Sequence, residues 1–302
     1  MSRPSILAVL LLGLVSAVHG HVRGKSFVVY ELPDEHLEQV DLHDGSIGDW
    51  EALMGAPSVR TRPDWVIGGH YDNGFTEVPY GVSDGDWRVW LAWNRSTSRI
   101  YFAMERRDDV HIGSSVGEGI YGAWEGDSVS LMIDGDHSGG EYGFYPGVGS
   151  GVCCESDEEY KLANNSQAQQ YWAIADPPRA GYLGAGAEWV NRPPFSDAGG
   201  RVEGNTSILE FYVTAFDSLV WDSPDMSVRS VFSAGMVIGF ELQVVDHDEP
   251  GGESGLSLLL ASQANPWRFA ERFVDGVLHP FGNPVSVVAD STWGGIKAGF
   301  RP

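Results

Sequence analysis

Short runs in which apolar side chains alternate with other residues recur along the chain, and clusters of Gly, Pro, Asp and Ser separate them. Alternation with a period of two is typical of β-strands that bury one face. Residues 87–93 show it most clearly, and a second apolar run at 98–104 follows the polar turn 94–97, so the two predict a hairpin. The same pattern predicts further strands at 127–133, 170–174, 207–214, 237–246 and 256–261, with an outer strand at 26–32.

Helical periodicity over three turns is absent nearly everywhere, and residues 267–274 have room for one or two turns. No repeat appears along the chain. Many short strands joined by Gly- and Pro-rich turns predict an all-β fold, an antiparallel two-sheet β-sandwich with long loop insertions. The longest connections fall within 138–204, where we expect an insertion. No linker divides residues 21–302, so they are expected to form a single domain.

Residues 1–20 are typical of an export signal, in which Arg3 supplies the positive end and 6–15 form an apolar run. Small residues follow, and cleavage after Ala17 or Gly20 suits the pattern. The apolar run is shorter than the ~20 residues that span a bilayer, although an uncleaved anchor is the alternative. We therefore expect a secreted, periplasmic or extracellular protein that is not in the membrane after cleavage.

The 302-residue chain is strongly acidic, with 42 Asp and Glu against 19 Lys and Arg and a formal net charge of −23. This balance argues against nucleic acid and anionic membranes as partners, because both attract cationic surfaces. The only cysteines, Cys153 and Cys154, are adjacent, and neighbouring Cα atoms lie about 3.8 Å apart, too close for an ordinary disulfide. A strained bridge and free thiols both stay open, and the core must hold the fold, with or without a metal.

Four motifs occur in a fixed order. They are a D-G-S-I-G-D-W opening at 44–50, the tryptophan-rich hairpin of 89–104, a W-E-G-D-S-V strand ending in D-G-D at 124–136, and I-G-F-E-L-Q-V-V-D at 238–246, followed by Trp267. This order resembles the family 9 carbohydrate-binding modules and their DOMON-like relatives. The resemblance implies a β-sandwich, calcium as a structural ion and sugar binding outside the cell, often beside enzymes of polysaccharide catabolism.

By this resemblance, Trp124 and Trp267 correspond to two tryptophans that clamp the faces of a sugar at a chain end. An indole plane desolvates the apolar face of a pyranose while polar groups bond its hydroxyl rim. The rim partners differ, because Ser130 stands where the family has Glu. The strand 170–174 lacks the family's Arg and Asn, so Tyr171 and Trp172 are expected to offer a more aromatic carbohydrate-binding surface, together with Gln169 and Gln170.

Tryptophans in sandwich strands usually belong to the core, and this is our expectation for Trp87, Trp90 and Trp93. For Trp124 and Trp267, which lie beside predicted loops, binding and packing both stay open.

The acidic residues Asp134, Asp136 and Glu141 are candidate calcium ligands, because oxygen-bearing side chains alternate there before a glycine. An EF-hand would carry Glu at the twelfth position, where this chain has Tyr145, so a sandwich-type site is expected instead. Otherwise these residues form a solvated turn. A second acidic turn lies at 246–249.

These features predict a non-catalytic carbohydrate-binding protein. One alternative is a part of a glycoside hydrolase system, although nothing isolates a catalytic pair such as Glu125 and Asp127 among 42 acids. Another is a structural or haem-carrying DOMON-like domain, with Met104 and His111 as ligands. The chain carries no G-x-S-x-G, P-loop or H-E-x-x-H motif. The sequence indicates neither the sugar nor the oligomeric state.

Overall fold

The computed structural model describes residues 26–60, 66–68, 85–114, 120, 122–143, 164–182, 187–250, 256–260 and 265–281. The expected export signal and both cysteines lie outside these ranges. Within them, no helix is long and apolar enough to cross a membrane.

The described residues form mostly β-strands, with two short helices, α1 (Asp34–Leu37) and α2 (Gly48–Met54). The strands are β1 (Ser26–Glu31), β2 (Val59–Arg60), β3 (Val66–Gly68), β4 (Gly85–Asn94), β5 (Arg99–Asp108), β6 (Ser128–Asp134), β7 (Gln169–Ala175), β8 (Pro178–Tyr182), β9 (Ser196–Glu203), β10 (Thr206–Thr214), β11 (Phe216–Ser218), β12 (Val228–Arg229), β13 (Val237–Asp246), β14 (Leu256–Leu259) and β15 (Val274–His279). Single 3₁₀ turns occupy Ala123–Glu125, Glu188–Asn191, Pro224–Met226 and Ala270–Arg272. The all-β expectation is confirmed.

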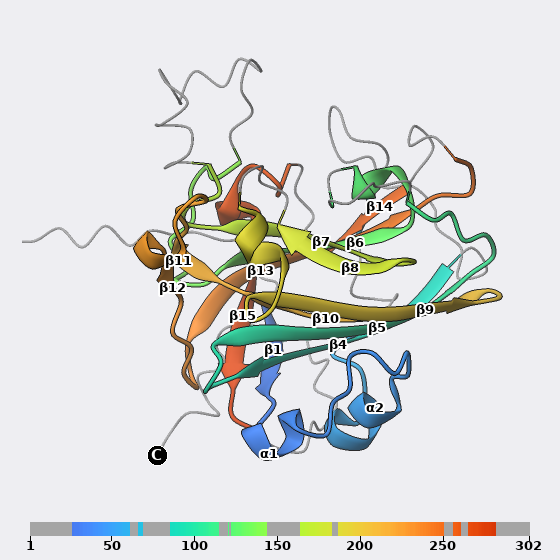
Figure 1. Cartoon of the computed structure of the whole chain (residues 1–302), viewed down its shortest axis with the longest axis horizontal. Helices are drawn as coiled ribbons and strands as arrows, with labels where there is room; N and C mark the ends of the chain where they lie inside the picture. Colours follow the sequence, from blue (N-terminus) through green and yellow to red (C-terminus); the bar gives the residue numbers. More distant parts are fainter. Residues whose placement is uncertain are drawn as a thin grey trace, which may run out of the picture.

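One large sheet runs in the order β8-β7-β6-β13-β15-β1-β4-β5-β10-β9, and β2, β3 and β14 pair beside this path (Figure 1). The small sheet β11-β12 stands apart from it. Neighbours are antiparallel except at β1, which pairs in parallel with both β15 and β4. The expected separation into two sheets is therefore not observed, because β1 joins the two halves instead of lying at an outer edge.

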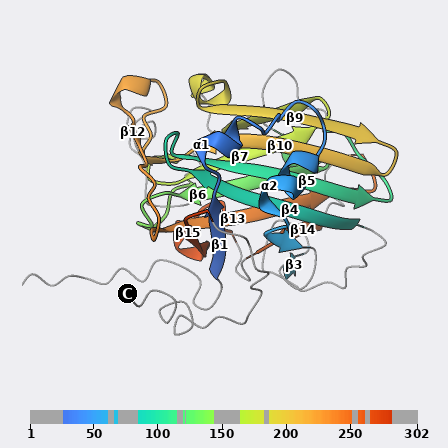
Figure 2. The same cartoon turned by 90° about the horizontal axis from the view of Figure 1, so that it is seen from below.

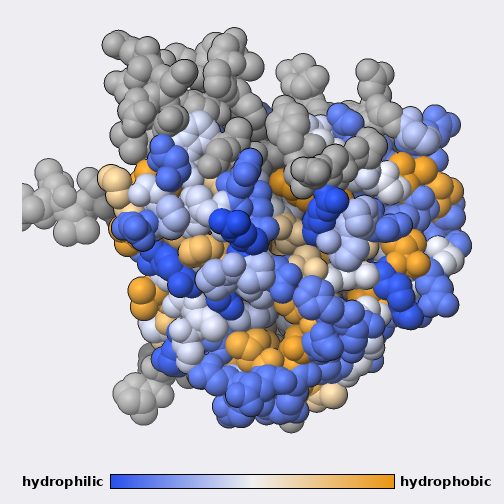
Figure 3. Space-filling view, in the orientation of Figure 1, coloured by the Kyte–Doolittle hydropathy of each residue, from blue (hydrophilic) through white to orange (hydrophobic). Residues whose placement is uncertain are grey.

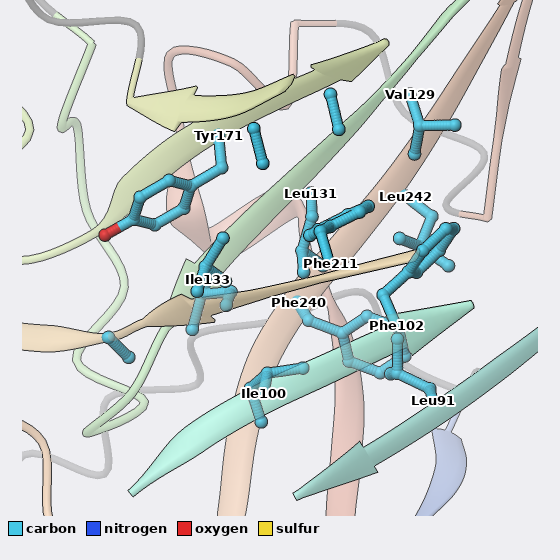
Figure 4. Close-up of a cluster of buried hydrophobic side chains, with 14 of the residues drawn as sticks. Leu91, Ile100, Phe102, Val129, Leu131, Ile133, Tyr171, Phe211, Phe240 and Leu242 are labelled. Atoms are coloured by element: carbon cyan, nitrogen blue, oxygen red, sulfur yellow. The ribbon is translucent and has the colours of Figure 1, made fainter. Parts of the chain in front are cut away.

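The two halves of the curved sheet enclose one apolar core. Leu131 of β6 and Phe240 of β13 meet Phe102 of β5 and Phe211 of β10 there (Figure 4). The rings of Phe102 and Phe211 stack with their centroids 4.5 Å apart. Alternate positions on each strand supply these side chains, as the period of two predicts.

A second apolar cluster lies outside the first, where the N-terminal helices cover β4, β5 and β10 (Figure 2). Trp50 and Met54 of α2 pack there with Trp90 of β4. Trp87 and Trp93 lie in the main core, and none of the three strand tryptophans is exposed. Their expected role as core residues is confirmed.

The range 138–204, expected as an insertion, contributes β7, β8 and β9 to the large sheet. Pro178 and Gly199 are turn signals in the sequence, yet they lie within β8 and β9. Both strands are at ends of the sheet path, and Pro178 is the first residue of its strand. A proline is tolerated at such a position because no central ladder loses a hydrogen bond.

The surface mixes hydrophilic and apolar residues, with separate apolar patches on the face shown in Figure 3. Met226, Val228 and Val231, near the small sheet, are among the exposed apolar side chains. Scattered apolar groups of this kind are ordinary on protein surfaces.

Candidate functional site

Two rows of side chains cross β7, β6 and β13 on the face that points away from the main core. Facing residues of an antiparallel ladder point to the same side, and successive residues point to opposite sides. The register therefore places the following residues together on the outer face: Trp172, Ser130 and Gln243 in one row, and Gln170, Met132 and Glu241 in the next.

Four members of these rows are polar yet buried: Ser130, Gln170, Gln243 and Glu241. Gln170 donates from Nε2 to Ser130 Oγ at 3.1 Å. Glu241 Oε1 accepts from the backbone N–H of Leu260 at 2.6 Å. Buried polar groups cost free energy unless they are hydrogen-bonded, so this polar strip on the outer face requires an explanation beyond packing.

Trp124 lies beside the first row. It stands in a 3₁₀ turn just before β6, is half-buried, and contacts Trp172 with ring centroids 5.9 Å apart. His247 fixes the turn, because its ring Nε2 lies 2.9 Å from the Trp124 carbonyl oxygen, which can only accept. The structure thus brings two of the expected binding residues, Trp124 and Trp172, together.

Trp267 lies beside the second row. It is half-buried and packs on a cluster that includes Met132, Tyr142 and Phe273. The hydroxyl of Tyr142 donates to the carbonyl of Pro266 at 3.0 Å and anchors the segment. Because Met132 belongs to the outer face, Trp124 and Trp267 lie on the same face of the sheet, each beside a different end of the polar strip.

Tyr171 points the opposite way. It is buried in the main core, and its hydroxyl donates to the carbonyl of Thr214 (Figure 4). Burial raises its pKa well above the ordinary value. The expectation that Tyr171 and Trp172 share a binding surface was wrong, since consecutive strand residues face opposite sides. Gln169 also faces inward and bonds to the backbone of Phe216.

The three expected calcium residues do not all converge, although Asp134 and Asp136 lie together and both accept from the Ser138 N–H, at 3.1 and 3.2 Å. The oxygens of buried Asp134 accept from the N–H groups of Gly139 at 2.6 Å and Ser138 at 3.1 Å. Burial raises the pKa of Asp134 to about 7. Asp136 is exposed, and Glu141 pairs with Arg268. In the described part of the chain, the groups of three acidic residues whose oxygens lie within 4.8 Å of one another are found outside the 134–141 loop. The loop therefore does not fit a calcium site built from three carboxylates.

Arg106 occupies the centre of the most buried acidic group. Its guanidinium forms ion pairs with Asp108, Asp127 and Asp246, and it donates from Nη1 to the carbonyl of Val245 at 3.0 Å. Asp108 also belongs to a second convergent group, with the exposed Asp109 and Asp248. Sequence reasoning missed the Arg106 cluster, because three separate strand ends supply its acids.

The environments of these carboxyls differ. Burial raises the pKa of Asp108 to about 7. Burial also acts to raise the pKa of Asp127, but hydrogen bonding to His111 and the charge of Arg106 outweigh it and hold that pKa below its ordinary value. Asp127, considered above with Glu125 as a catalytic pair, is thus committed to an ion-pair cluster. Met104, considered with His111 for haem, lies in the main core.

Comparison of the chain with known protein families and with curated proteins gives no match. Among solved structures, it is similar to a family 9 carbohydrate-binding module from Caldicellulosiruptor kristjanssonii in complex with cellotriose, with a TM-score of 0.51 and 13% identity over 88% of this chain and 99% of that one. The same module in complex with glucose gives a TM-score of 0.51 and 12% identity over 87% and 100% of the two chains. The chain therefore has a fold like that of the family 9 carbohydrate-binding modules.

Proposed function

We propose that this protein is a secreted, non-catalytic carbohydrate-binding protein that recognises the ends of sugar chains by stacking on Trp124 and Trp267. The observation that carries the proposal is the placement of these two half-buried indoles on one outer face of the sheet, at either end of a buried polar strip. The likeness in fold to modules that bind cellotriose and glucose supports it.

The chemistry of the face suits a pyranose. Its C–H faces are apolar, and an indole covers them without needing a hydrogen-bond partner. Its hydroxyl rim needs donors and acceptors, which Ser130, Gln170 and Gln243 supply between the two indoles. A few convergent polar groups set among aromatic walls are the usual composition of a small-ligand site.

Export and a structural calcium ion are also part of the proposal. Export rests on the charge and apolar pattern of residues 1–20, and N-terminal sequencing of the mature protein is expected to begin after Ala17 or Gly20. Calcium rests on the resemblance; in the loop 134–141, Asp134 and Asp136 lie together, whereas Glu141 pairs with Arg268.

The test is calorimetric titration of the parent with glucose and cellotriose, after a glycan array has established which sugars bind. Trp124→Ala and Trp267→Ala are each expected to weaken binding at least about tenfold, since each removes one stacking face. Trp189→Ala is the matched control, because this half-buried indole packs on Phe195 and Phe216 away from the strip. Unchanged affinity in both clamp variants, or a parent that binds no glycan, contradicts the proposal.

A further inference from the structure

We infer that Arg99 and Arg229 form a second binding site, which takes a carboxylate group of a ligand. The two guanidinium groups come from separate parts of the fold, because Arg99 opens β5 and Arg229 ends β12. Arg99 shares the outer face of β5 and β10 with Tyr101 and Tyr212 of the second apolar cluster. The site therefore lies across the core from the polar strip, and it goes beyond the proposed function.

Two hydrogen bonds hold the arginines beside each other. Arg229 donates from Nη2 to the carbonyl of Thr97 at 3.0 Å, and the backbone N–H of Phe232 donates to Ser98 Oγ at 3.2 Å. The turn that leads into β5 is thereby fastened to the segment that carries Arg229. Burial lowers the pKa of Arg229, and the charge of Arg99 lowers it further. The two like charges repel, and an anion bound to both would relieve that repulsion.

Aromatic rings lie against both guanidinium groups. The Cζ of Arg99 lies over the Tyr212 ring, 4.4 Å from its centroid, and the Cζ of Arg229 lies over the Phe195 ring at 5.7 Å. Packing of this kind covers the face of a guanidinium and leaves its N–H bonds available in the plane. Such a planar fork matches the two oxygens of a carboxylate, so the arrangement favours a carboxylate as the bound anion.

Neither arginine forms an ion pair within the described part of the chain. The guanidinium of Arg99 makes no hydrogen bond there, and its Nε is a buried donor without an acceptor. By contrast, Arg88, Arg95 and Arg106 all pair with carboxylates, in a chain that has 42 Asp and Glu. A buried cationic donor without an acceptor costs free energy. A carboxylate supplied by a ligand would remove that cost.

Two acidic residues on neighbouring strands are bound by other groups. Asp197 of β9 lies 3.2 Å from the ring Nε2 of His43. Asp217 of β11 accepts from the hydroxyl of Ser230 at 2.5 Å. Neither forms an ion pair with the two arginines, so the site is open to an external anion although the protein as a whole is acidic.

The test is calorimetric titration of the full chain with acetate, glucuronate and sulfate, at pH 7 and constant ionic strength. Acetate and glucuronate are expected to bind, and Arg99→Met and Arg229→Met are each expected to weaken that binding at least about tenfold, since each removes one of the two cations. Arg107→Met is the matched control, because it removes a 71% exposed arginine at the other end of β5 and changes the net charge equally. It should bind both carboxylates as the parent does.

Arg229→Lys keeps the charge and removes the planar fork. Its exposed position makes it the variant that decides the matter if Arg99→Met does not fold, and about a three- to tenfold loss of carboxylate affinity is expected. Glucuronate bound more tightly than acetate would identify an acidic sugar as the ligand, and equal affinities would identify a free carboxylate. If neither carboxylate binds, if binding persists in every folded arginine variant, or if sulfate binds more tightly than both carboxylates, the inference is wrong.

Discussion

The indole nitrogen of Trp50 lies 2.8 Å from Oε1 of Glu210, although 160 positions separate the two residues in the sequence. The bond fastens α2 to the outer face of β10. Glu210 is fully buried, and its Oε2 has no hydrogen-bond partner among the described residues. Burial raises the pKa of Glu210 to about 8, and the charges of Asp49 and Asp44 act in the same direction. The folded protein therefore holds this carboxyl protonated at neutral pH.

Glu210→Gln is expected to stabilise the protein increasingly as pH rises. The carboxyl pKa in the unfolded chain is 4.5, so between pH 4.5 and about 8 the folded state binds a proton that the unfolded state does not. Its contribution to stability is complete below pH 4.5 and is lost as pH rises to about 8. Glutamine keeps the shape without the charge, so the Tm of the variant should match the parent at pH 4 and exceed it at pH 9.

Thermal melts from pH 4 to pH 9 measure this difference in Tm. Glu203→Gln, an exposed change on β9, is the control and should follow the parent throughout. A constant Tm difference between Glu210→Gln and the parent across the range contradicts the assignment.

Gly199→Ala is expected to destabilise the fold by at least about 1–3 kcal/mol. A Cβ at Gly199 would lie 1.6 Å from the carbonyl oxygen of Leu42 and 2.8 Å from the Cα of His43. Both are backbone atoms, so the loop that precedes α2 would have to move off β9. Urea denaturation measures the change. Gly113→Ala is the control, because its nearest neighbour would be 4.0 Å away, and equal stability of the two variants contradicts the close contact.

Local pattern predicted the strands that alternate strongly, such as residues 87–93 and 237–246, because the period of two follows from burial of one face. It did not predict the place of β1, whose two parallel partners are distant in sequence. Nor did it predict β9, since Gly199 and Gly200 resemble a turn. These glycines are needed because Leu42 and Ala175 approach their backbone closely.

The binding face was predictable only in part. In β7 every residue is buried, so apolar and polar positions did not reveal which side chains face the core. Pairing with β6 decides that Trp172 faces outward and Tyr171 inward. The Arg106 cluster was hidden for a different reason, because Asp108, Asp127 and Asp246 meet only after three strand ends are brought together.

Tyr171→Phe is expected to lower stability by about 1 kcal/mol, since it removes one buried hydrogen bond to Thr214. Sugar affinity should not change, because the ring lies in the core. Urea denaturation and glucose titration of the same sample measure the two effects. A loss of affinity without a loss of stability would return Tyr171 to the binding face.

Calcium is testable through the Tm in the presence and absence of a chelator. If calcium is a structural ion of this fold, chelation lowers the Tm of the parent, and an unchanged Tm removes calcium from the proposal.

The Asp134→Asn variant tests the role of Asp134 in the loop. Its oxygens accept from Ser138 and Gly139, so the variant should lower the Tm equally with and without chelator. A fall in Tm that is seen only when calcium is present, and not with chelator, would make Asp134 a calcium ligand.

Arg106→Met is expected to destabilise the protein by about 3–5 kcal/mol at pH 8, because it leaves three buried carboxylates without their cation. Protonation relieves this repulsion, and burial already raises the pKa of Asp108 to about 7. The loss of stability should therefore be smaller at pH 5, and Asp108→Asn added to Arg106→Met should restore part of the stability.

Arg106→Met should also lower the affinity for sugar. Asp127 accepts from the His247 N–H at 2.9 Å, and His247 holds the Trp124 turn.

Arg107→Met is the matched control for urea denaturation at both pH values. This neighbouring side chain is 71% exposed and lies 3.8 Å from Glu105, so its removal should change stability by less than about 1 kcal/mol. Both variants change the net charge equally. A difference in stability between them therefore reports the loss of the buried ion pairs of Arg106 and not the loss of a positive charge in general. If Arg106→Met is as stable as Arg107→Met at pH 8, the guanidinium is not what holds the three carboxylates together.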